Sequence, residues 1–271
     1  ASRGQIRFHL LVKILGVIPA RYASTRFPGK PLHPIAGRPL IQHVVDRCRR
    51  AKCLADVIVA TDDARILEHV ESFGGKAVMT HPDHPSGTDR CWEAYLNVKG
   101  KGQRAEGNTY HTPTMPNDYI INIQGDEPFV APEQIDELGA VLDGKVELAS
   151  QMIPVSDAEL LFDLGEAKVI VNEQMEAIYF SRQVIPFLKG YPQDEWHRHH
   201  TYYRQVGMYA YRADILEKIT KLPVSPLEKA ESLEQLRWLQ HGYKIKMALT
   251  TYESHCIDTP EDVEKILKMI F

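Results

Sequence analysis

The feature that most constrains this chain is a series of short, nearly all-apolar runs separated by segments with helical periodicity. Runs of strand length occur at Lys13–Pro19, Asp56–Thr61, Lys76–Met79 and Tyr119–Ile123. The segments between them carry apolar residues at helical spacing, and they are Pro39–Ala51, Asp63–Phe73 and about Thr88 to Leu96. Strands that are apolar on both faces and separated by helices are typical of a parallel sheet covered on both sides. We therefore expect an α/β fold whose ligands bind at the carboxyl ends of the strands.

The pattern changes after about residue 147, where strands follow one another with fewer helices between them. Strand-like segments are expected at 147–155, 167–171, 175–180, 206–211 and 244–250. A helix is expected near Pro226–Gln240 and a closing helix after Pro260. This predicts three parts: an α/β core over 13–150, a smaller mixed α/β lobe over 151–225, and a return to the core over 226–271.

Charge and cysteine usage exclude several classes of protein. The 271 residues include 32 Lys and Arg against 36 Asp and Glu, for a formal net charge of −4. That balance argues against broad binding to nucleic acid. The four cysteines include no Cys-x-x-Cys pair, so reduced thiols are expected rather than a zinc site or a disulfide scaffold. The apolar stretch around Lys13 is too short to span a bilayer, so we expect no membrane association and a cytoplasmic protein.

Three cations lie on the loop that follows the first expected strand. Arg21, Arg26 and Lys30 stand in IPARYASTRFPGKPL, among small residues such as Ser24 and Gly29 that allow close approach of the backbone to a ligand. Arginine grips phosphate through paired hydrogen bonds, and lysine acts as a mobile point charge. A polyphosphate cradle is one interpretation, and a solvated basic turn is the other. The loop is not a Walker A motif, because proline follows the lysine where Ser or Thr is required.

Two acidic positions follow other strands. Asp126 stands in NIQGDEPFV directly after a glycine, and Asp258 stands in HCIDTPEDVEKI before a helix that begins with Pro260. A carboxylate at the tip of a buried parallel strand commonly presents itself to Mg²⁺ held by substrate phosphates. The alternatives are a helix-capping acid for Asp126 and a simple turn acid for Asp258.

The loop HPDHPSGTDR places three small residues at an expected helix start. Ser86, Gly87 and Thr88 could read the edge of a nucleobase or bind an anion through backbone amides and hydroxyls. An ordinary Ser/Thr cap explains the same residues.

Taken together, seven blocks resemble those of the sugar-acid cytidylyltransferases, and within them the branch that uses 3-deoxy-manno-octulosonate (KDO). The blocks are ARYASTRFPGKPL, HPSGTDR, NIQGDEP, AIYFSR, VGMYAYR, ESLEQLRWL and IDTPEDVEKI, and the similarity runs from about Lys13 to Met269. The resemblance implies a Rossmann-like nucleotidyltransferase sheet with a smaller dimerisation lobe that also contacts the sugar acid. It implies transfer of CMP from CTP to KDO with release of pyrophosphate for lipopolysaccharide biosynthesis. It also implies Mg²⁺ as cofactor and a homodimer.

The resemblance assigns roles to residues at matching positions. Arg21, Arg26 and Lys30 would hold the triphosphate, and Ser86, Gly87 and Thr88 would face the cytosine. Asp126 and Asp258 would bind Mg²⁺, with Arg21, Lys30 and Asp126 acting in catalysis. The sugar acid would lie against the second lobe, near Gln124 (also expected to contact the nucleotide), Arg182, Gln205, Tyr209, Glu231 and Gln235.

Two features depart from the family pattern. Gln205 stands where the family usually has histidine, and it can hydrogen-bond but cannot become cationic. The segment 97–117, rich in Gly, Pro, Lys and Asn, lies outside the usual pattern and is expected to be an exposed insertion. The exact sugar acid therefore stays open between KDO, its 8-amino analogue and sialic acid. A non-catalytic nucleotide-binding protein is a further alternative, while a nicotinamide dehydrogenase lacks its glycine fingerprint.

Overall fold

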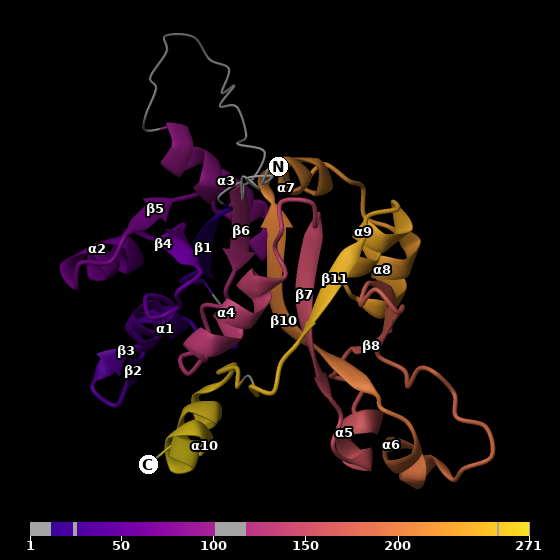
Figure 1. The fold of residues 1–271 in the computed structure, drawn as a ribbon. Coiled ribbons are helices and arrows are strands. Elements are labelled where there is room, and N and C mark those ends of the chain that lie inside the picture. The colour runs from indigo at the N-terminus through magenta and orange to yellow at the C-terminus, as the bar shows by residue number, and fades with distance from the viewer. Residues whose placement is uncertain (1–11, 24–25, 101–117, 254, 271) are drawn as a thin grey trace, which may run out of the picture.

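The computed structural model describes residues 12–23, 26–100, 118–253 and 255–270 of the chain, and a nine-stranded sheet forms its middle (Figure 1). The strands are β1 (Lys13–Ala20), β4 (Leu54–Thr61), β5 (Ala77–Met79), β6 (Asp118–Asn122), β7 (Leu148–Pro154), β8 (Lys168–Val171), β9 (Ala177–Ser181), β10 (Tyr203–Arg212) and β11 (Ile245–Leu249). Their order is β11-β7-β10-β6-β1-β4-β5, with β8 and β9 attached through β10. A separate two-stranded sheet pairs β2 (Pro34–Ile35) with β3 (Arg38–Pro39).

Pairing in the sheet is parallel except around β10. β1 pairs in parallel with both β4 and β6, and β11 pairs in parallel with β7. β10 runs antiparallel between β6 and β7, and β8 and β9 extend it as an antiparallel hairpin. The mostly parallel α/β fold expected from the sequence is confirmed.

Helices cover both faces of this sheet, because successive residues of each strand point to opposite sides. Ile14 and Ile18 of β1 belong to a core shared with α1 (Leu40–Cys48) and α4 (Pro132–Ala140). Val17 belongs to a core on the other face. The helices there are α3 (Gly87–Gly100), α7 (Ala213–Ile219), α8 (Pro226–Glu231) and α9 (Gln235–Gln240).

Helices at the margins complete the fold. α2 (Ala64–Ser72) packs beside β5, and α10 (Pro260–Ile270) closes the described chain. A short 3-10 turn, η1 (Lys30–Leu32), follows the loop after β1. Within the described residues, no helix combines the length and hydropathy needed to cross a membrane.

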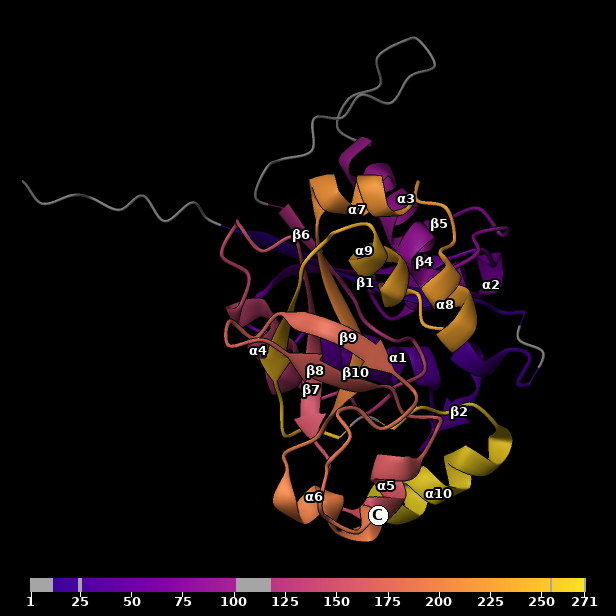
Figure 2. The same cartoon turned by 90° about the vertical axis from the view of Figure 1, so that its right-hand side faces the viewer.

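The segment between β7 and β10 forms a lobe that projects from one end of the sheet (Figures 1 and 2). Its helices are α5 (Ala158–Phe162) and α6 (Trp196–His199), and the 3-10 turn η2 (Gln193–Glu195) directly precedes α6. A small core of its own includes Leu161, Trp196 and Tyr202. Since β7 and β10 belong to the main sheet, that sheet continues across the boundary expected at residue 151.

Several expected elements differ in extent. The single helix expected near Pro226–Gln240 is wrong: α8 and α9 are separate, because Ser232 between them adopts a left-handed conformation with φ of 54°. β10 begins at Tyr203 rather than Val206. α3 continues to Gly100, so the first residues of the 97–117 segment are helical, while 101–117 lie outside the described residues.

Candidate active site

Four of the predicted residues converge where β1 and β6 end. Lys30 Nζ donates to Asp126 Oδ2 at 2.8 Å and to the carbonyl oxygen of Ile257 at 2.8 Å, and it lies 3.6 Å from Asp258 Oδ1. Arg26 grips Asp258 with two bonds of 3.0 and 3.2 Å. We call Arg26, Lys30, Asp126 and Asp258 the charged cluster. It joins segments that are 96 to 232 positions apart in the chain.

Close backbone packing holds the cluster in place. Gly29 has a φ of +71°, and its N–H donates to the carbonyl of Tyr22, which turns Lys30 back toward β6. Gly125 packs so tightly that a Cβ there would lie 2.5 Å from the carbonyl oxygen of Pro19. The N–H of Ile257 donates to the carbonyl of Asp126 at 2.9 Å, which brings the segment before α10 against the turn after β6.

The two carboxylates of the cluster fit a magnesium ion by donor type and number. Mg²⁺ in nucleotide sites is usually held by one or two carboxylates, with phosphates and water supplying the remaining oxygens. Asp126 and Asp258 approach the same ammonium group, so they already share one small cation between them. Among the described residues, no group of three or more His, Cys, Asp or Glu side chains is arranged to hold a metal. The triphosphate would therefore have to complete the coordination.

The loop expected to face the base lies at the start of α3. The Ser86 hydroxyl donates to Asp89 Oδ2 at 2.7 Å and accepts from the Asp89 N–H at 3.3 Å, which is the capping arrangement given as the alternative. Arg21 donates to the carbonyl of His84 at 2.5 Å, so the loop after β1 contacts the loop before α3. Thr88 is buried and its hydroxyl points inward. The Thr88 hydroxyl is thus engaged by Glu234, and contact of Ser86, Gly87 and Thr88 with cytosine stays a prediction.

Glu234 is a residue that the sequence reasoning missed. Its Oε2 accepts the Thr88 hydroxyl at 2.9 Å, and the same hydroxyl lies 3.3 Å from Tyr211 Oη. Burial raises the pKa of the Glu234 carboxyl, although the hydrogen bond from the Thr88 hydroxyl opposes that shift. The only signal in the sequence was its position directly before Gln235 in ESLEQLRWL. That signal is weak, because an acid three positions before Arg237 is also typical of a solvated helix face.

Three residues predicted to contact the sugar acid form a second group on β10 and α9. Gln205 Nε2 donates to Tyr209 Oη at 2.6 Å and to Ser150 Oγ at 3.1 Å. Gln235 Nε2 donates to Gln205 Oε1 at 2.6 Å. We call Ser150, Gln205, Tyr209 and Gln235 the amide network. Gln124, at the end of β6, donates to the carbonyl of Gly207 at 2.8 Å and so lies against the same strand, β10.

Arg182 and Glu231 contact each other instead of the amide network. The Arg182 N–H donates to Glu231 Oε2 at 2.9 Å, and its Nε donates to the Glu231 carbonyl at 2.8 Å. Its guanidinium also donates to the carbonyls of Leu164 and Gly165 at 3.0 Å. In this conformation Arg182 joins β9 to α8 and to the turn before β8, and its contact with a sugar acid stays a prediction.

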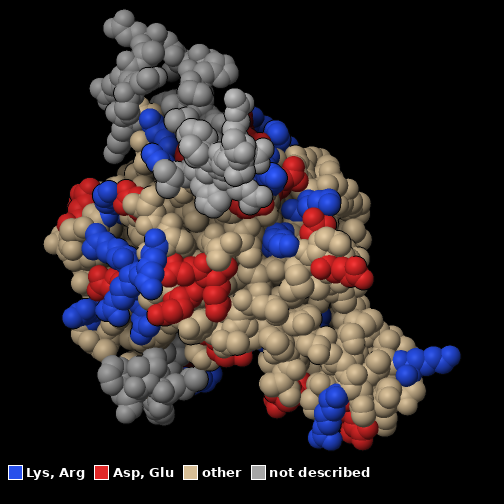
Figure 3. Space-filling model, viewed as in Figure 1, with Lys and Arg blue, Asp and Glu red and all other residues tan. Residues whose placement is uncertain are grey.

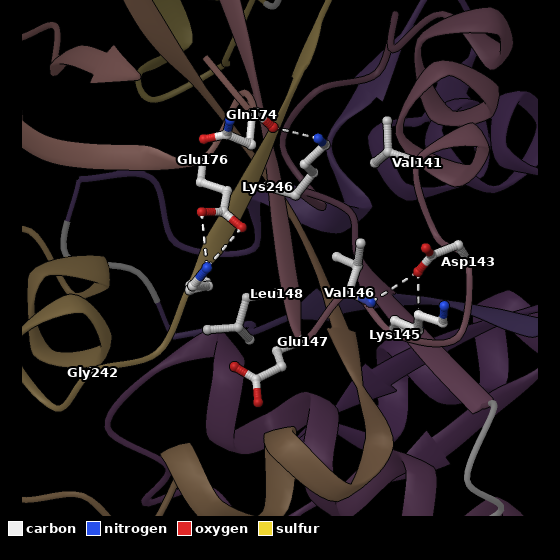
Figure 4. A pocket seen from close by; sticks show the side chains of 11 residues that line it. Val141, Asp143, Lys145, Val146, Glu147, Leu148, Gln174, Glu176, Gly242 and Lys246 are labelled. Atoms are coloured by element: carbon white, nitrogen blue, oxygen red, sulfur yellow. Dashed lines mark hydrogen bonds and ion pairs between the residues drawn. The ribbon is translucent and has the colours of Figure 1, made fainter. Parts of the chain in front are cut away.

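A cavity of about 610 Å³ lies elsewhere, at the amino ends of β7 and β11 (Figure 4). Two of the lysines that line it have partners: Lys244 pairs with Glu176, and Lys246 donates to the carbonyl of Gln174. None of the predicted site residues lines it. The cavity is therefore at the opposite end of the sheet from the charged cluster.

The fold and the charged cluster define a nucleotidyltransferase, an enzyme class that handles a nucleoside triphosphate at the carboxyl end of a mostly parallel sheet. The chain belongs to the cytidylyltransferase family, whose model matches residues 15–245. It is 51% identical over 256 residues to the 3-deoxy-manno-octulosonate cytidylyltransferase of Cytophaga hutchinsonii, covering 94% of this chain and 96% of that protein. It is 41% identical to the 8-amino-3,8-dideoxy-manno-octulosonate cytidylyltransferase of Shewanella halifaxensis, covering 91% and 94%.

Solved structures agree. A CMP:2-keto-3-deoxy-manno-octonic acid synthetase solved in complex with CTP superposes with a TM-score of 0.80 at 38% identity, covering 95% of this chain and 98% of that one. A 4-diphosphocytidyl-2C-methyl-D-erythritol synthase from Anaerococcus prevotii, 14% identical with a TM-score of 0.58 over 96% of this chain and 99% of that one, shares the fold.

Proposed function

We propose that this protein transfers CMP from CTP to the anomeric hydroxyl of KDO, giving CMP-KDO and pyrophosphate for lipopolysaccharide biosynthesis. The observation that carries the proposal is the convergence of Arg26, Lys30, Asp126 and Asp258 at the ends of β1 and β6. Relatives that are 51% and 48% identical over nearly the whole chain bear the name of this activity, which supports the proposal.

The residues of the cluster divide the work of a phosphoryl transfer. In that reaction a bond forms between the sugar oxygen and the α-phosphorus while the bond to pyrophosphate breaks, so negative charge accumulates on the leaving group. Lys30 and Arg21 would stabilise that charge, and Arg26 would bind the triphosphate. Such preorganised charges are effective because they are already oriented before the reaction begins. We assign no general base.

We further propose Mg²⁺ as cofactor, held by Asp126 and Asp258. A bound Mg²⁺ lowers the pKa of a nearby hydroxyl and neutralises charge on the phosphates. Asp126 and Asp258 supply its oxygen ligands, and Lys30 holds both carboxylates toward one another before the nucleotide binds. Activity should therefore be lost on chelation and return with added Mg²⁺.

We propose KDO rather than its 8-amino analogue as the substrate, on the basis of sequence identity to relatives named for each acid. A relative named for KDO is 51% identical to this chain, and one named for the 8-amino acid is 41% identical. Gln205 stands in place of the family's histidine, so it is the residue at which a preference for another sugar acid would most readily arise.

The projecting lobe is proposed as the contact between two copies of the chain. Phe187 is 72% exposed and Leu164 is 56% exposed, and Tyr191 adds a third large exposed side chain. Exposed apolar side chains gathered on one lobe are typical of an interaction surface. Figure 3 shows few charged side chains on the body of this lobe. Basic and acidic residues are interspersed over the rest of that face, which does not favour a nucleic-acid partner.

The free cysteines agree with a reducing compartment, and we place the protein in the cytoplasm.

The test is pyrophosphate release by purified protein with Mg²⁺ and CTP. Four reactions are compared: KDO, 8-amino-KDO, sialic acid and no sugar acid. Release that requires KDO supports the proposal. Release only with another acid would retain the chemistry and replace the substrate. CTP binding without release for any acid would favour a nucleotide-binding protein instead.

A further inference from the structure

The direction of the hydrogen bonds in the amide network can be worked out from the contacts of Ser150 with two backbone carbonyls. Ser150 lies on β7, fully buried, with Oγ 3.0 Å from the carbonyl oxygen of Met208 and 3.3 Å from that of Val206. The pairing of β10 with β7 shifts register between Val206 and Tyr209, which turns these carbonyls toward the serine.

Carbonyl oxygens only accept hydrogen bonds, and a serine hydroxyl has a single proton. Ser150 must give that proton to one of the two carbonyls. In its contact with Gln205 the Ser150 hydroxyl can then only accept a hydrogen bond. The part of the Gln205 amide that faces Ser150 must therefore be the NH₂ group. The Oε1 of Gln205 consequently faces Gln235, which donates to it at 2.6 Å.

The same amide group decides what Tyr209 can do. Gln205 Nε2 lies 2.6 Å from Tyr209 Oη, and an amide NH₂ only donates. Tyr209 therefore accepts from Gln205 and has its own proton left to donate elsewhere. Its ring is held by Trp238 at 5.3 Å in an edge-to-face contact, while the side chain stays partly exposed. Burial raises the pKa of Tyr209, so the hydroxyl keeps its proton.

The orientation of the Gln124 amide also follows from its contact with a backbone carbonyl, but it leaves an acceptor, not a donor, for a ligand. Its Nε2 donates to the carbonyl of Gly207, which leaves its Oε1 to accept. Tyr209 on β10 and Gln124 just after β6 thus offer one donor and one acceptor.

We infer that Ser150 is a positioning residue that, through Gln205, directs the Tyr209 proton toward the sugar acid. The inference rests on the proposed function and deepens it. The ligand atom that meets Tyr209 must be an accepting oxygen, either of the carboxylate or of a hydroxyl group. A protonated amine, which only donates, does not fit that position.

The test reverses the direction of the network with the near-isosteric change Gln205→Glu. The new carboxylate only accepts, so it takes the Tyr209 proton away from the ligand. In the wild-type protein, Tyr209→Phe should raise KM for KDO by about 10- to 100-fold, as expected for a lost hydrogen bond to a charged or polar oxygen. Q205E alone should cause a similar rise. In the Q205E background, Y209F should add less than about 2-fold, because interacting residues are not additive.

Serine variants and a control on the same strand make the test specific. Ser150→Ala removes the acceptor that orients Gln205 and should raise KM for KDO with kcat and KM for CTP little changed, while Ser150→Thr keeps the hydroxyl and should restore the wild-type KM. Tyr203→Phe, also on β10, should leave both KM values unchanged. Circular dichroism and CTP binding check that each variant folds.

A Y209F effect of the same size in both backgrounds would overturn the inference and leave the proposed function intact. Equal KM values for S150A and S150T would do so as well. If the wild-type protein uses a different sugar acid, the same cycle is measured with that acid. No turnover with any acid would overturn both the proposed function and this inference.

Discussion

Lys30 shows how one side chain can organise a site before its ligand arrives. Its ammonium group contacts oxygens of Asp126, Ile257 and Asp258, which come from two segments far apart in the chain. Without that charge Asp126 would lose its cationic partner, and only Arg26 would remain to offset the charge of Asp258, in a partly buried place where repulsion is stronger than in water.

The substitution Lys30→Ala should lower kcat by about 100- to 1000-fold, the usual effect of removing a preorganised charge that acts on the transition state. Initial rates over a range of CTP concentrations separate kcat from KM. The exposed Lys52→Ala serves as a charge-matched control and should behave as the wild type. A change confined to KM for CTP would mean that Lys30 binds substrate and transition state equally and has no separate catalytic role.

Glu234 leads to a prediction about pH and stability. Burial raises the pKa of this carboxyl in the folded protein above its ordinary 4.5, so the folded state holds the proton more tightly than the unfolded chain. Stability from this group is therefore complete below the unfolded pKa and is lost as pH rises through the folded one. Glu234→Gln, which can still accept from Thr88, should be increasingly more stable than the wild type from pH ~4.5 upward. Thermal unfolding of both proteins between pH 4 and 8 measures this, and a difference in Tm that stays constant with pH would contradict it.

At the scale of elements, the turn after β6 depends on how closely it passes β1. Asp126 follows Gly125 in that turn, and the contact of Gly125 with the Pro19 carbonyl leaves no room for a side chain. Because the obstructing atom belongs to the backbone of a central strand, it cannot rotate away.

Gly125→Ala should therefore reduce the free energy of unfolding by about 1–3 kcal/mol, as overpacking does, and displace Asp126 enough to lower activity. Urea unfolding and initial rates are the two measurements. Gly207→Ala is the matched control for stability, since a Cβ at Gly207 meets no described atom within 4 Å. Equal unfolding free energies for the two variants would show that the turn can move.

The elements also show where local sequence is sufficient and where it is not. β1, β4 and β6 lie where continuous apolar runs predicted strands, because a strand buried on both faces has few polar positions to hide its pattern. The break between α8 and α9 was not predictable, since a left-handed serine such as Ser232 is stabilised by its surroundings rather than by its own preference.

At the scale of the whole molecule, the lobe of α5 and α6 should join two copies of the chain. Phe187→Glu places a charge where the proposed contact would bury it, and burying an unpaired charge is costly. Light scattering after size-exclusion chromatography should find twice the chain mass for the wild type and a shift toward the monomer for F187E. Met79→Glu, at the opposite edge strand β5, changes an apolar side chain of 45% exposure and should leave the mass unchanged. A wild-type monomer would overturn the proposal.

The sequence by itself determined the class of fold, the position of most strands and the residue types of the site, because apolar periodicity and the Arg, Lys and Asp positions are local properties of the chain. Only the tertiary structure decided which of those residues meet. Arg26 and Asp258 are 232 positions apart, and their pairing depends on the order of the strands and on the turn at Gly125. Burial of Glu234 and the inward direction of Thr88 likewise depend on α9 packing against the sheet. The proton on Tyr209 is directed by Ser150, a residue with no motif of its own, since hydrogen-bond direction is set by the groups that surround an amide and not by the amide itself.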